Sequence, residues 1–223
     1  MLDEDGNEDL SKFTHAQLNE RLWEHASTGD IDGARSCLDA GASPKSKSGG
    51  ERTTPLMRAC IRGHAAMAAL LVPMSNLDDV DRDGATAAMR CCQEGQAECL
   101  RVLIAAKADL EKRDKRGDSP LFRAVRYGAQ AWEDGSKGLK SPDADELGRV
   151  DCLDLLLGAG DLRARDANGE TASDIARGGD LPDLMAAIDA RLLAASEKAT
   201  LSKLGQRKAA MSEQMAPPPR TSL

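Results

Sequence analysis

The sequence predicts an all-α repeat solenoid, a stack of about five helix-turn-helix units with projecting loop fingers, and three observations support this fold class. A block of about ten residues recurs at a spacing near 33, which is typical of stacked repeats. Aromatic residues make up only 2% of the 223 residues and hydrophobic residues 41%, so the core depends on Ala, Leu and Met, which favour helices over sheets. Asp-x-x-Gly turns separate the blocks.

Each block has the composition of a short capped helix. Three clear copies occupy residues 54–63, 86–95 and 119–128, a weaker copy precedes them at 22–29, and another follows at 169–176. The first residue is usually Thr or Ser, which caps a helix, and Pro or Ala at the next position fits the first turn. An apolar pair downstream predicts a second helix. Helices this short are stable only when each pair buries its apolar stripe against its neighbours.

The pattern resembles the ankyrin repeat, whose helix start reads Thr-Pro-Leu-His-x-Ala and is followed by Gly and a Leu-Leu pair. The run Thr54-Pro55-Leu56-Met57-Arg58-Ala59 carries the resemblance, which covers roughly residues 18–193. The positions of the family's histidine hold Trp23, Met57, Met89, Phe122 and Asp174. The resemblance implies that the histidine's hydrogen bond to the loop is lost, so we expect a more apolar and less rigid finger base.

The chain divides into two tails and one array. Residues 1–13 form an acidic N-terminal tail, residues 14–194 the repeat array, and residues 195–223 a flexible basic C-terminal tail. Thr14 and Gln17 have the spacing of a capping box that opens the first helix. The last residues, Thr221-Ser222-Leu223, resemble the terminal pattern read by PDZ domains, although such a short pattern is also typical of an ordinary disordered end.

The fourth repeat contains an insertion at about residues 129–148. Ser119 and Thr171, which are equivalent in the repeat, lie 52 residues apart rather than about 33. The surplus residues are rich in Gly, Ser, Pro and acids, and they predict a surface excursion between the two helices of this repeat. Trp132 and Leu139 are its candidate contact residues, and folding back onto the array is the alternative.

No residue pattern indicates catalysis, a metal or a cofactor. All six cysteines occupy repeat columns that are expected to be buried, where Cys acts as a small hydrophobic residue. His64 follows the glycine that ends an inner helix and has a structural interpretation. No partnered nucleophile or phosphate-binding loop is evident. We therefore expect a protein that is not an enzyme and has no small-molecule substrate.

Charge and hydropathy narrow the location and the partners. The formal net charge is −7, which argues against wholesale binding to nucleic acid. No stretch approaches 18 consecutive apolar residues, and the first 12 residues are too acidic for a secretory signal, so we expect no membrane association. The expected location is the cytoplasm, with the nucleus as the alternative, and the thiols are expected to be reduced.

One column of the repeat predicts a binding surface. Three consecutive repeats place an arginine at the same helix position, namely Arg58, Arg90 and Arg123. With the apolar stripe buried, we expect these side chains to be exposed as a ladder on the concave inner-helix face, where Arg suits carboxylates or phosphates. Arg62, Arg126 and Tyr127 extend the ladder, and Trp132 is a further candidate contact. The alternative is that these are ordinary solvated charges. In the repeat between Arg62 and Arg126, Glu94 stands at the position equivalent to Arg62 and interrupts this extension of the ladder.

These patterns predict a protein–protein interaction module, or adaptor, that binds an acidic or extended segment of another protein through the arginine ladder. A second hypothesis is a constitutive structural subunit of a large assembly, anchored by the insertion and the tails. A third, an enzyme or a thiol protein, depends on no residue that the sequence identifies.

Overall fold

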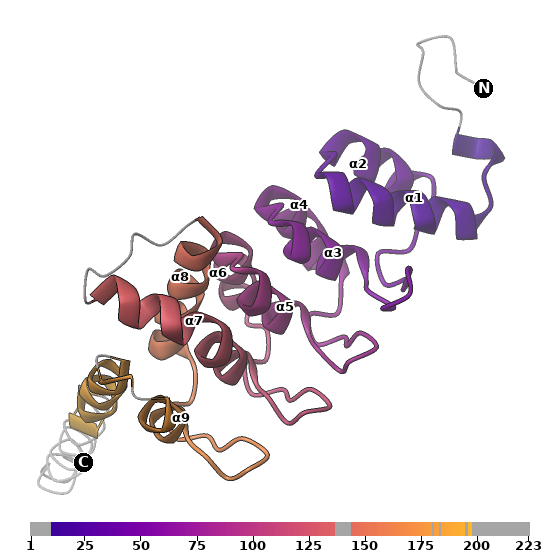
Figure 1. The fold of residues 1–223 in the computed structure, drawn as a ribbon. Coiled ribbons are helices and arrows are strands. Elements are labelled where there is room, and N and C mark those ends of the chain that lie inside the picture. Colours follow the sequence, from indigo (N-terminus) through magenta and orange to yellow (C-terminus); the bar gives the residue numbers. More distant parts are fainter. Residues whose placement is uncertain (1–9, 137–143, 180, 183, 195, 198–223) are drawn as a thin grey trace, which may run out of the picture.

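The computed structural model describes residues 10–136, 144–179, 181–182, 184–194 and 196–197. Their helices are stacked in two rows, an inner row and an outer row (Figure 1). The inner row comprises α1 (His15–Thr28), α3 (Pro55–Arg62), α5 (Ala87–Glu94), α7 (Pro120–Ser136) and α9 (Ala172–Gly178). The outer row comprises α2 (Ile31–Asp39), α4 (Ala65–Leu71), α6 (Ala97–Ala105) and α8 (Ala144–Ala159), and residues 184–194 are also helical. Two short 3-10 turns, η1 (Leu10–Lys12) and η2 (Val72–Met74), complete the described elements.

The inner helices begin and end where the sequence predicts. Thr54, Thr86 and Thr171 each accept a hydrogen bond from the backbone amide three residues later, which satisfies a donor at the open end of the helix. Gly63 and Gly95 end α3 and α5 with positive φ values of 79° and 73°, a conformation that other residues adopt at a cost. The capping box of Thr14 and Gln17 at the start of α1 is present, which confirms that prediction.

The core runs through the stack between the two rows. Each inner helix packs on the next inner helix, and α4, α6 and α8 pack in sequence in the outer row. Ala59, Cys60, Cys91 and Cys92 on the inner helices are fully buried, and their small side chains allow neighbouring helices to approach closely. Leucines and methionines fill the wider space between the rows. This burial supplies the stability that such short helices lack alone.

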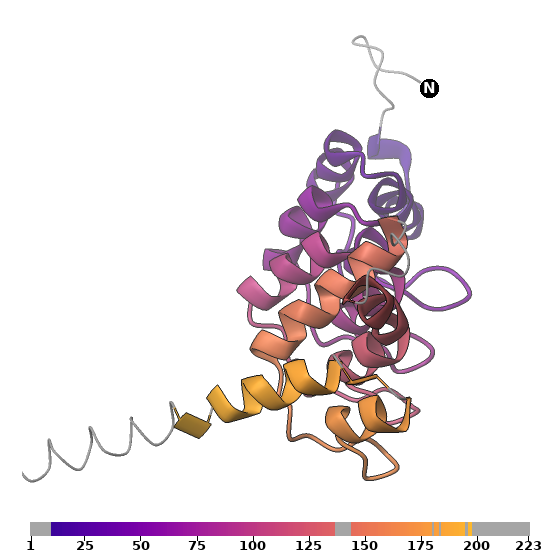
Figure 2. The same ribbon diagram turned by 60° about the vertical axis from the view of Figure 1, so that its left-hand side comes forward.

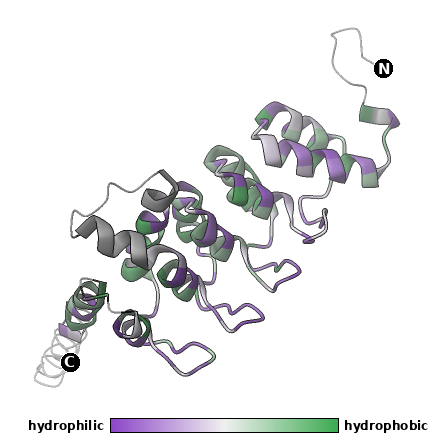
Figure 3. Cartoon of the chain, viewed as in Figure 1, coloured by the Kyte–Doolittle hydropathy of each residue, from purple (hydrophilic) through white to green (hydrophobic). Residues whose placement is uncertain are grey.

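Hydrophilic loops project from the inner row as fingers. The turned view in Figure 2 shows the outer row on one side of the array and the loops on the other. Figure 3 shows that the loops are mostly hydrophilic, whereas the helices carry the hydrophobic residues. The first loop is closed by an isolated antiparallel bridge between Ser48 and Thr53. We call the loops that precede α3, α5, α7 and α9 the finger loops.

The insertion departs from the prediction of a surface excursion. α7 continues beyond Gly128 to Ser136, and α8 already begins at Ala144, so most of residues 129–148 lengthens the two helices of one repeat. The two helices pack against each other. Continuous backbone hydrogen bonding within a helix satisfies polar groups that a long loop would leave to solvent, which explains the preference. Leu139, most of both tails and the terminal Thr221-Ser222-Leu223 lie outside the described residues.

Within the described ranges, none of the helices combines the length and the apolar composition that crossing a bilayer requires.

Candidate functional site

An aspartate closes each of three finger loops by binding the backbone of its own turn. Oδ1 of Asp81 accepts hydrogen bonds from the amides of Asp83 (2.9 Å) and Ala85 (3.0 Å). Asp114 and Asp166 repeat this arrangement with the amides two and four residues further along. All three aspartates are buried, so the remaining oxygen, Oδ2, requires a cation or a further donor.

Two of these aspartates pair with an arginine of the helix that follows. Nε of Arg90 lies 2.7 Å from Oδ2 of Asp81, and Nη2 of Arg123 lies 2.6 Å from Oδ2 of Asp114. In each case the arginine follows its aspartate by nine residues. Each of these repeats therefore ties its finger loop to its own inner helix.

The last finger loop is tied to the neighbouring repeat instead. Ile175 stands nine residues after Asp166, where the two preceding repeats have arginine. Arg126 of α7 supplies the cation, with Nη2 at 2.9 Å from Oδ2 of Asp166 and Nε at 3.2 Å from Oδ1 of Asp118. The side chain of Arg126 is 40% exposed, so this ion pair is more accessible to solvent than the pairs of Arg90 and Arg123. It links α7 to the next repeat.

The predicted exposed ladder is wrong for two of its three members. Arg90 is 6% exposed and Arg123 is 5% exposed. Their helix position lies over the entering finger loop, and a buried carboxylate there attracts the guanidinium. The sequence did contain a signal for this pairing, because an aspartate precedes both arginines by nine residues. Replacing either side chain would disturb the fold, contrary to the expectation that all three sites are exposed.

The pairing favours the charged forms of Arg90 and Asp114. Burial alone disfavours the charge of Arg90, but hydrogen bonding and attraction from Asp81 outweigh burial and raise the pKa of Arg90. Burial likewise disfavours ionisation of Asp114. Hydrogen bonds from Arg123 and from two backbone amides outweigh it, so the pKa of Asp114 is lowered.

These pairs also correct the expectation about the finger base. Met57, Met89 and Phe122, which replace the family's histidine in three repeats, are fully buried. Trp23, which replaces it in the first repeat, keeps a hydrogen bond to the loop, because its Nε1 donates to the hydroxyl of Thr53 at 2.9 Å. The loops before α5 and α7 do not lack a polar anchor either, because the aspartate–arginine pairs supply one.

Arg58 and Arg62 differ from the buried pairs. The guanidinium of Arg58 stacks on Trp23, 4.5 Å from the ring centroid, and Nε donates to the hydroxyl of Ser27 at 3.2 Å. Partial burial and, secondarily, repulsion from Arg62 lower the pKa of Arg58. Arg62 itself is exposed and has no ion pair within the described part of the chain.

A glutamine connects the two buried arginines across repeats. Oε1 of Gln93 accepts from Nη1 of Arg90 at 3.2 Å and from Nη1 of Arg123 at 2.6 Å. Beside this bridge lies a polar pocket of about 190 Å³, which we call the finger pocket. Its lining residues are Asp83, Arg90, Gln93, Lys115, Arg116, Arg123 and Tyr127. The comparison of equivalent repeat positions did not identify Gln93, Lys115 or Arg116. These residues become neighbours only because α5, α7 and a finger loop meet in the folded chain.

Tyr127 is the exposed aromatic residue of this region. It is 43% exposed on α7 and lies at the finger pocket. Trp132 lies five residues further along in the same helix, but its side chain is outside the described part of the structure. The structure thus brings Arg90, Arg123 and Tyr127 together, whereas Arg58 of α3 lies against Trp23 of α1, in the preceding repeat.

The cysteines and His64 have structural positions. All six cysteines are buried, as predicted, and burial raises the pKa of the Cys91 and Cys92 thiols well above the ordinary value. Nε2 of His64 lies 3.0 Å from the carbonyl oxygen of Ser27, so the histidine ties two repeats together. Among the described residues, no three His, Cys, Asp or Glu side chains are grouped so that they could hold a metal ion.

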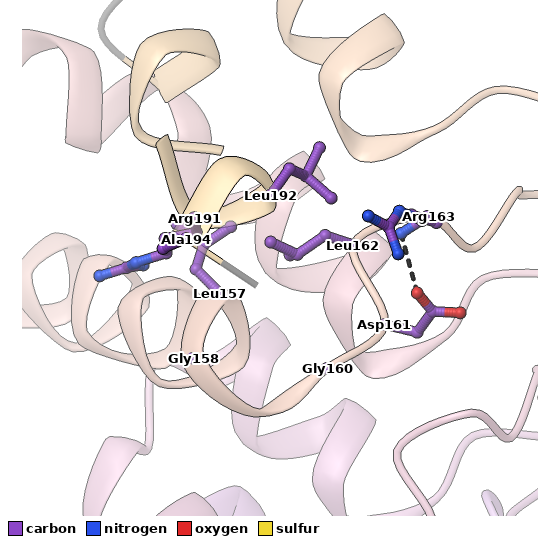
Figure 4. Close-up of a pocket in the computed structure, with 9 residues that line it drawn as sticks. All are labelled: Leu157, Gly158, Gly160, Asp161, Leu162, Arg163, Arg191, Leu192 and Ala194. Carbon is purple, nitrogen blue, oxygen red and sulfur yellow. Dashed lines mark hydrogen bonds between the residues drawn. The ribbon is translucent and has the colours of Figure 1, made fainter. Parts of the chain in front are cut away.

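A second pocket, of about 330 Å³, lies between the end of α8 and the helical residues 184–194 (Figure 4). Leu157, Leu162 and Leu192 line it. Asp161 accepts from the amide of Arg163 at 2.9 Å, and Nη2 of Arg191 pairs with Asp154 at 2.6 Å, whereas Nη1 of Arg191 is buried without a hydrogen-bond partner among the described residues. The pocket is a gap between the last two layers of the stack rather than part of the finger-loop surface.

The paired helices, the projecting loops and the continuous core define a helical solenoid of the kind that presents an extended surface to other molecules. A family model for ankyrin repeats, three copies, matches residues 22–114 and 75–132. The chain belongs to the ankyrin repeat family. A search of curated proteins found no match. Ankyrin repeats generally mediate protein–protein interactions and are typically non-catalytic.

Proposed function

We propose that this chain is a non-catalytic adaptor that binds a partner protein on its inner-helix face. This face consists of the exposed sides of α3, α5 and α7 and the finger loops before α5 and α7. The proposal is supported by exposed side chains on this face. Arg62, Lys115 and Arg116 are exposed cations without an ion pair in the described structure, and Tyr127 is an exposed aromatic residue. The proposed surface differs from the predicted ladder, because Arg90 and Arg123 are buried and paired with aspartates instead of being fully exposed.

The exposed groups suit recognition rather than stability. An unpaired surface cation contributes little to folding, whereas arginine and tyrosine are enriched among residues that dominate binding energy. Arg62 and Tyr127 occupy equivalent positions two repeats apart, one residue before the glycine of each block. A partner that contacts both would follow the stack across α5.

A double variant with a matched control tests the proposal. Arg62→Ala with Tyr127→Ala removes one cation and one exposed ring from the inner-helix face. Arg101→Ala with Met74→Ala removes an exposed cation and an exposed apolar side chain from α6 and η2. The full-length chain captures partners from cell extract, and the affinity of the purified partner is then measured for all three proteins. The inner-face variant should bind at least about tenfold more weakly, while the control matches the wild type. Equal affinity of the two variants would refute the proposal.

A further inference from the structure

The finger pocket contains hydrogen-bond donors that the fold does not use. Arginine has five N–H groups, and Arg123 spends three of them, on Asp114 twice and on Gln93 once. One N–H therefore remains on each terminal nitrogen, Nη1 and Nη2. The side chain of Arg123 is only 7% exposed, so these donors are held rigidly within the wall of the pocket.

The pocket also contains cations without ion-pair partners. Lys115 and Arg116 belong to the finger loop before α7, line the pocket and have no ion pair in the described part of the chain. The loop itself is fixed, because the amide of Lys115 donates to the carbonyl of Asp83 at 3.1 Å and the amide of Arg116 donates to Asp114. Two exposed cations of an ordered loop thus line the same pocket as a buried, preorganised arginine.

The charge of the pocket suits a monoanion. Arg90 pairs with Asp81, Asp83 and Glu51, and Arg123 pairs with Asp114, so Lys115 and Arg116 are the cations of the pocket that have no ion pair among the described residues. A carboxylate brings a single negative charge to these two cations. The second charge of a phosphate dianion would lie close to Asp83 and Glu51, which repel it.

We propose that the finger pocket binds one carboxylate side chain, Asp or Glu, of an extended segment of the partner protein. The inference rests on the proposed function, because it assigns a recognition element to the inner-helix face. The acid accepts hydrogen bonds from Arg123 and from the heads of Lys115 and Arg116, and Tyr127 packs beside it at the pocket edge. Charge-assisted hydrogen bonds of this kind are the strong ones, and Arg123 is already oriented for them.

Selection of peptides provides the test. Random 12-residue peptides displayed on phage are selected against the full-length chain, and the recovered sequences are synthesised. The pocket variant is Lys115→Gln with Arg116→Gln. The charge-matched control is Lys107→Gln with Lys112→Gln, which removes two exposed cations between α6 and α7 that do not line the pocket. Thermal melts confirm that both variants fold as the wild type does.

We expect the selected peptides to share an acid at one position. Changing that acid to its amide should weaken binding to the wild type and the control about tenfold or more, and should have little effect on binding to the pocket variant. The inference is overturned if no peptide is recovered or if the recovered peptides share no acid. It is also overturned if the change from acid to amide weakens binding to the pocket variant as much as to the wild type, or if a phosphoserine peptide binds more tightly. Peptides that lack a shared acid but lose affinity for the Arg62→Ala, Tyr127→Ala variant would leave the proposed function standing. Peptides that bind this variant and the pocket variant as tightly as the wild type would count against both.

Discussion

Replacing Arg123 by methionine should destabilise the array substantially, although the side chain lies at the candidate binding surface. Methionine retains an unbranched apolar stem and removes the guanidinium. The change leaves the carboxylate of Asp114, which is fully inaccessible to solvent, without its cation. Arg62→Met is the matched control, because Arg62 is an exposed arginine of another inner helix and has no ion pair within the described residues.

The magnitude follows from the contacts that are lost. Arg123 donates to Asp114 at 3.0 and 2.6 Å and to Gln93 at 2.6 Å. Breaking a buried ion pair from one side costs about 3–5 kcal/mol, because the remaining charge is uncompensated. Asp114 retains two backbone amide donors, which places the expected loss near the lower end, at about 3 kcal/mol. For a chain of this size that loss lowers Tm by about 6–12 °C, whereas the control should stay within about 0.5 kcal/mol of the wild type.

A second substitution separates the ion pair from simple loss of packing. Asp114→Asn removes the stranded charge and keeps a carbonyl oxygen for the two amides, so in the Arg123→Met background it should restore about 1 kcal/mol or more. Urea unfolding of the full-length chain, followed by far-UV circular dichroism, measures all four proteins. The reasoning is refuted if Arg123→Met loses no more stability than Arg62→Met, or if Asp114→Asn does not raise the stability of the Arg123→Met protein.

Three other expectations concern pH, helix packing and the thiols. The lowered pKa of Asp114 contributes stability at pH values above its unfolded pKa near 3.8, and this stability is lost as the pH falls through the folded pKa. Removing Arg123 removes a cause of the lowered pKa, so the stability that Arg123→Met loses relative to the wild type should shrink on acidification. Urea titrations at several pH values measure this difference, and a difference that does not change with pH would contradict the expectation. Gly148→Ala should destabilise by about 1–3 kcal/mol because its Cβ would collide with the carbonyl oxygen of Gly95, whereas Gly158→Ala has open space and should be neutral or stabilising by up to about 1 kcal/mol. Melting curves that rank these two variants in the opposite order would be inconsistent with the packing of α8 on α5. A thiol reagent should modify none of the six buried cysteines in the native chain and all of them after unfolding; rapid labelling of the native chain would show that one is accessible.

The sequence alone determined the features that repeat and that depend on local interactions. The threonine caps, the glycine helix ends and the buried cysteine columns follow from short-range backbone chemistry and from a stripe that recurs in each repeat. Because each repeat packs only on its neighbours, one readable copy predicted the position of the core in the others. The array and its family could be predicted for this reason.

Only the tertiary structure decided the direction of the arginines and the form of the insertion. Repeat position places Arg90 and Arg123 off the apolar stripe, but it does not say that a finger loop folds over them and buries a carboxylate against each. Arg126 reaches Asp166 across 40 residues, and Gln93 reaches Arg123 across 30, so neither contact has a local signature. The insertion lengthens α7 and α8, which pack on each other, and the Gly, Ser and Pro content of the sequence did not reveal this packing. Side-chain direction and helix length depend on which surfaces meet, and in this chain those surfaces come from different repeats.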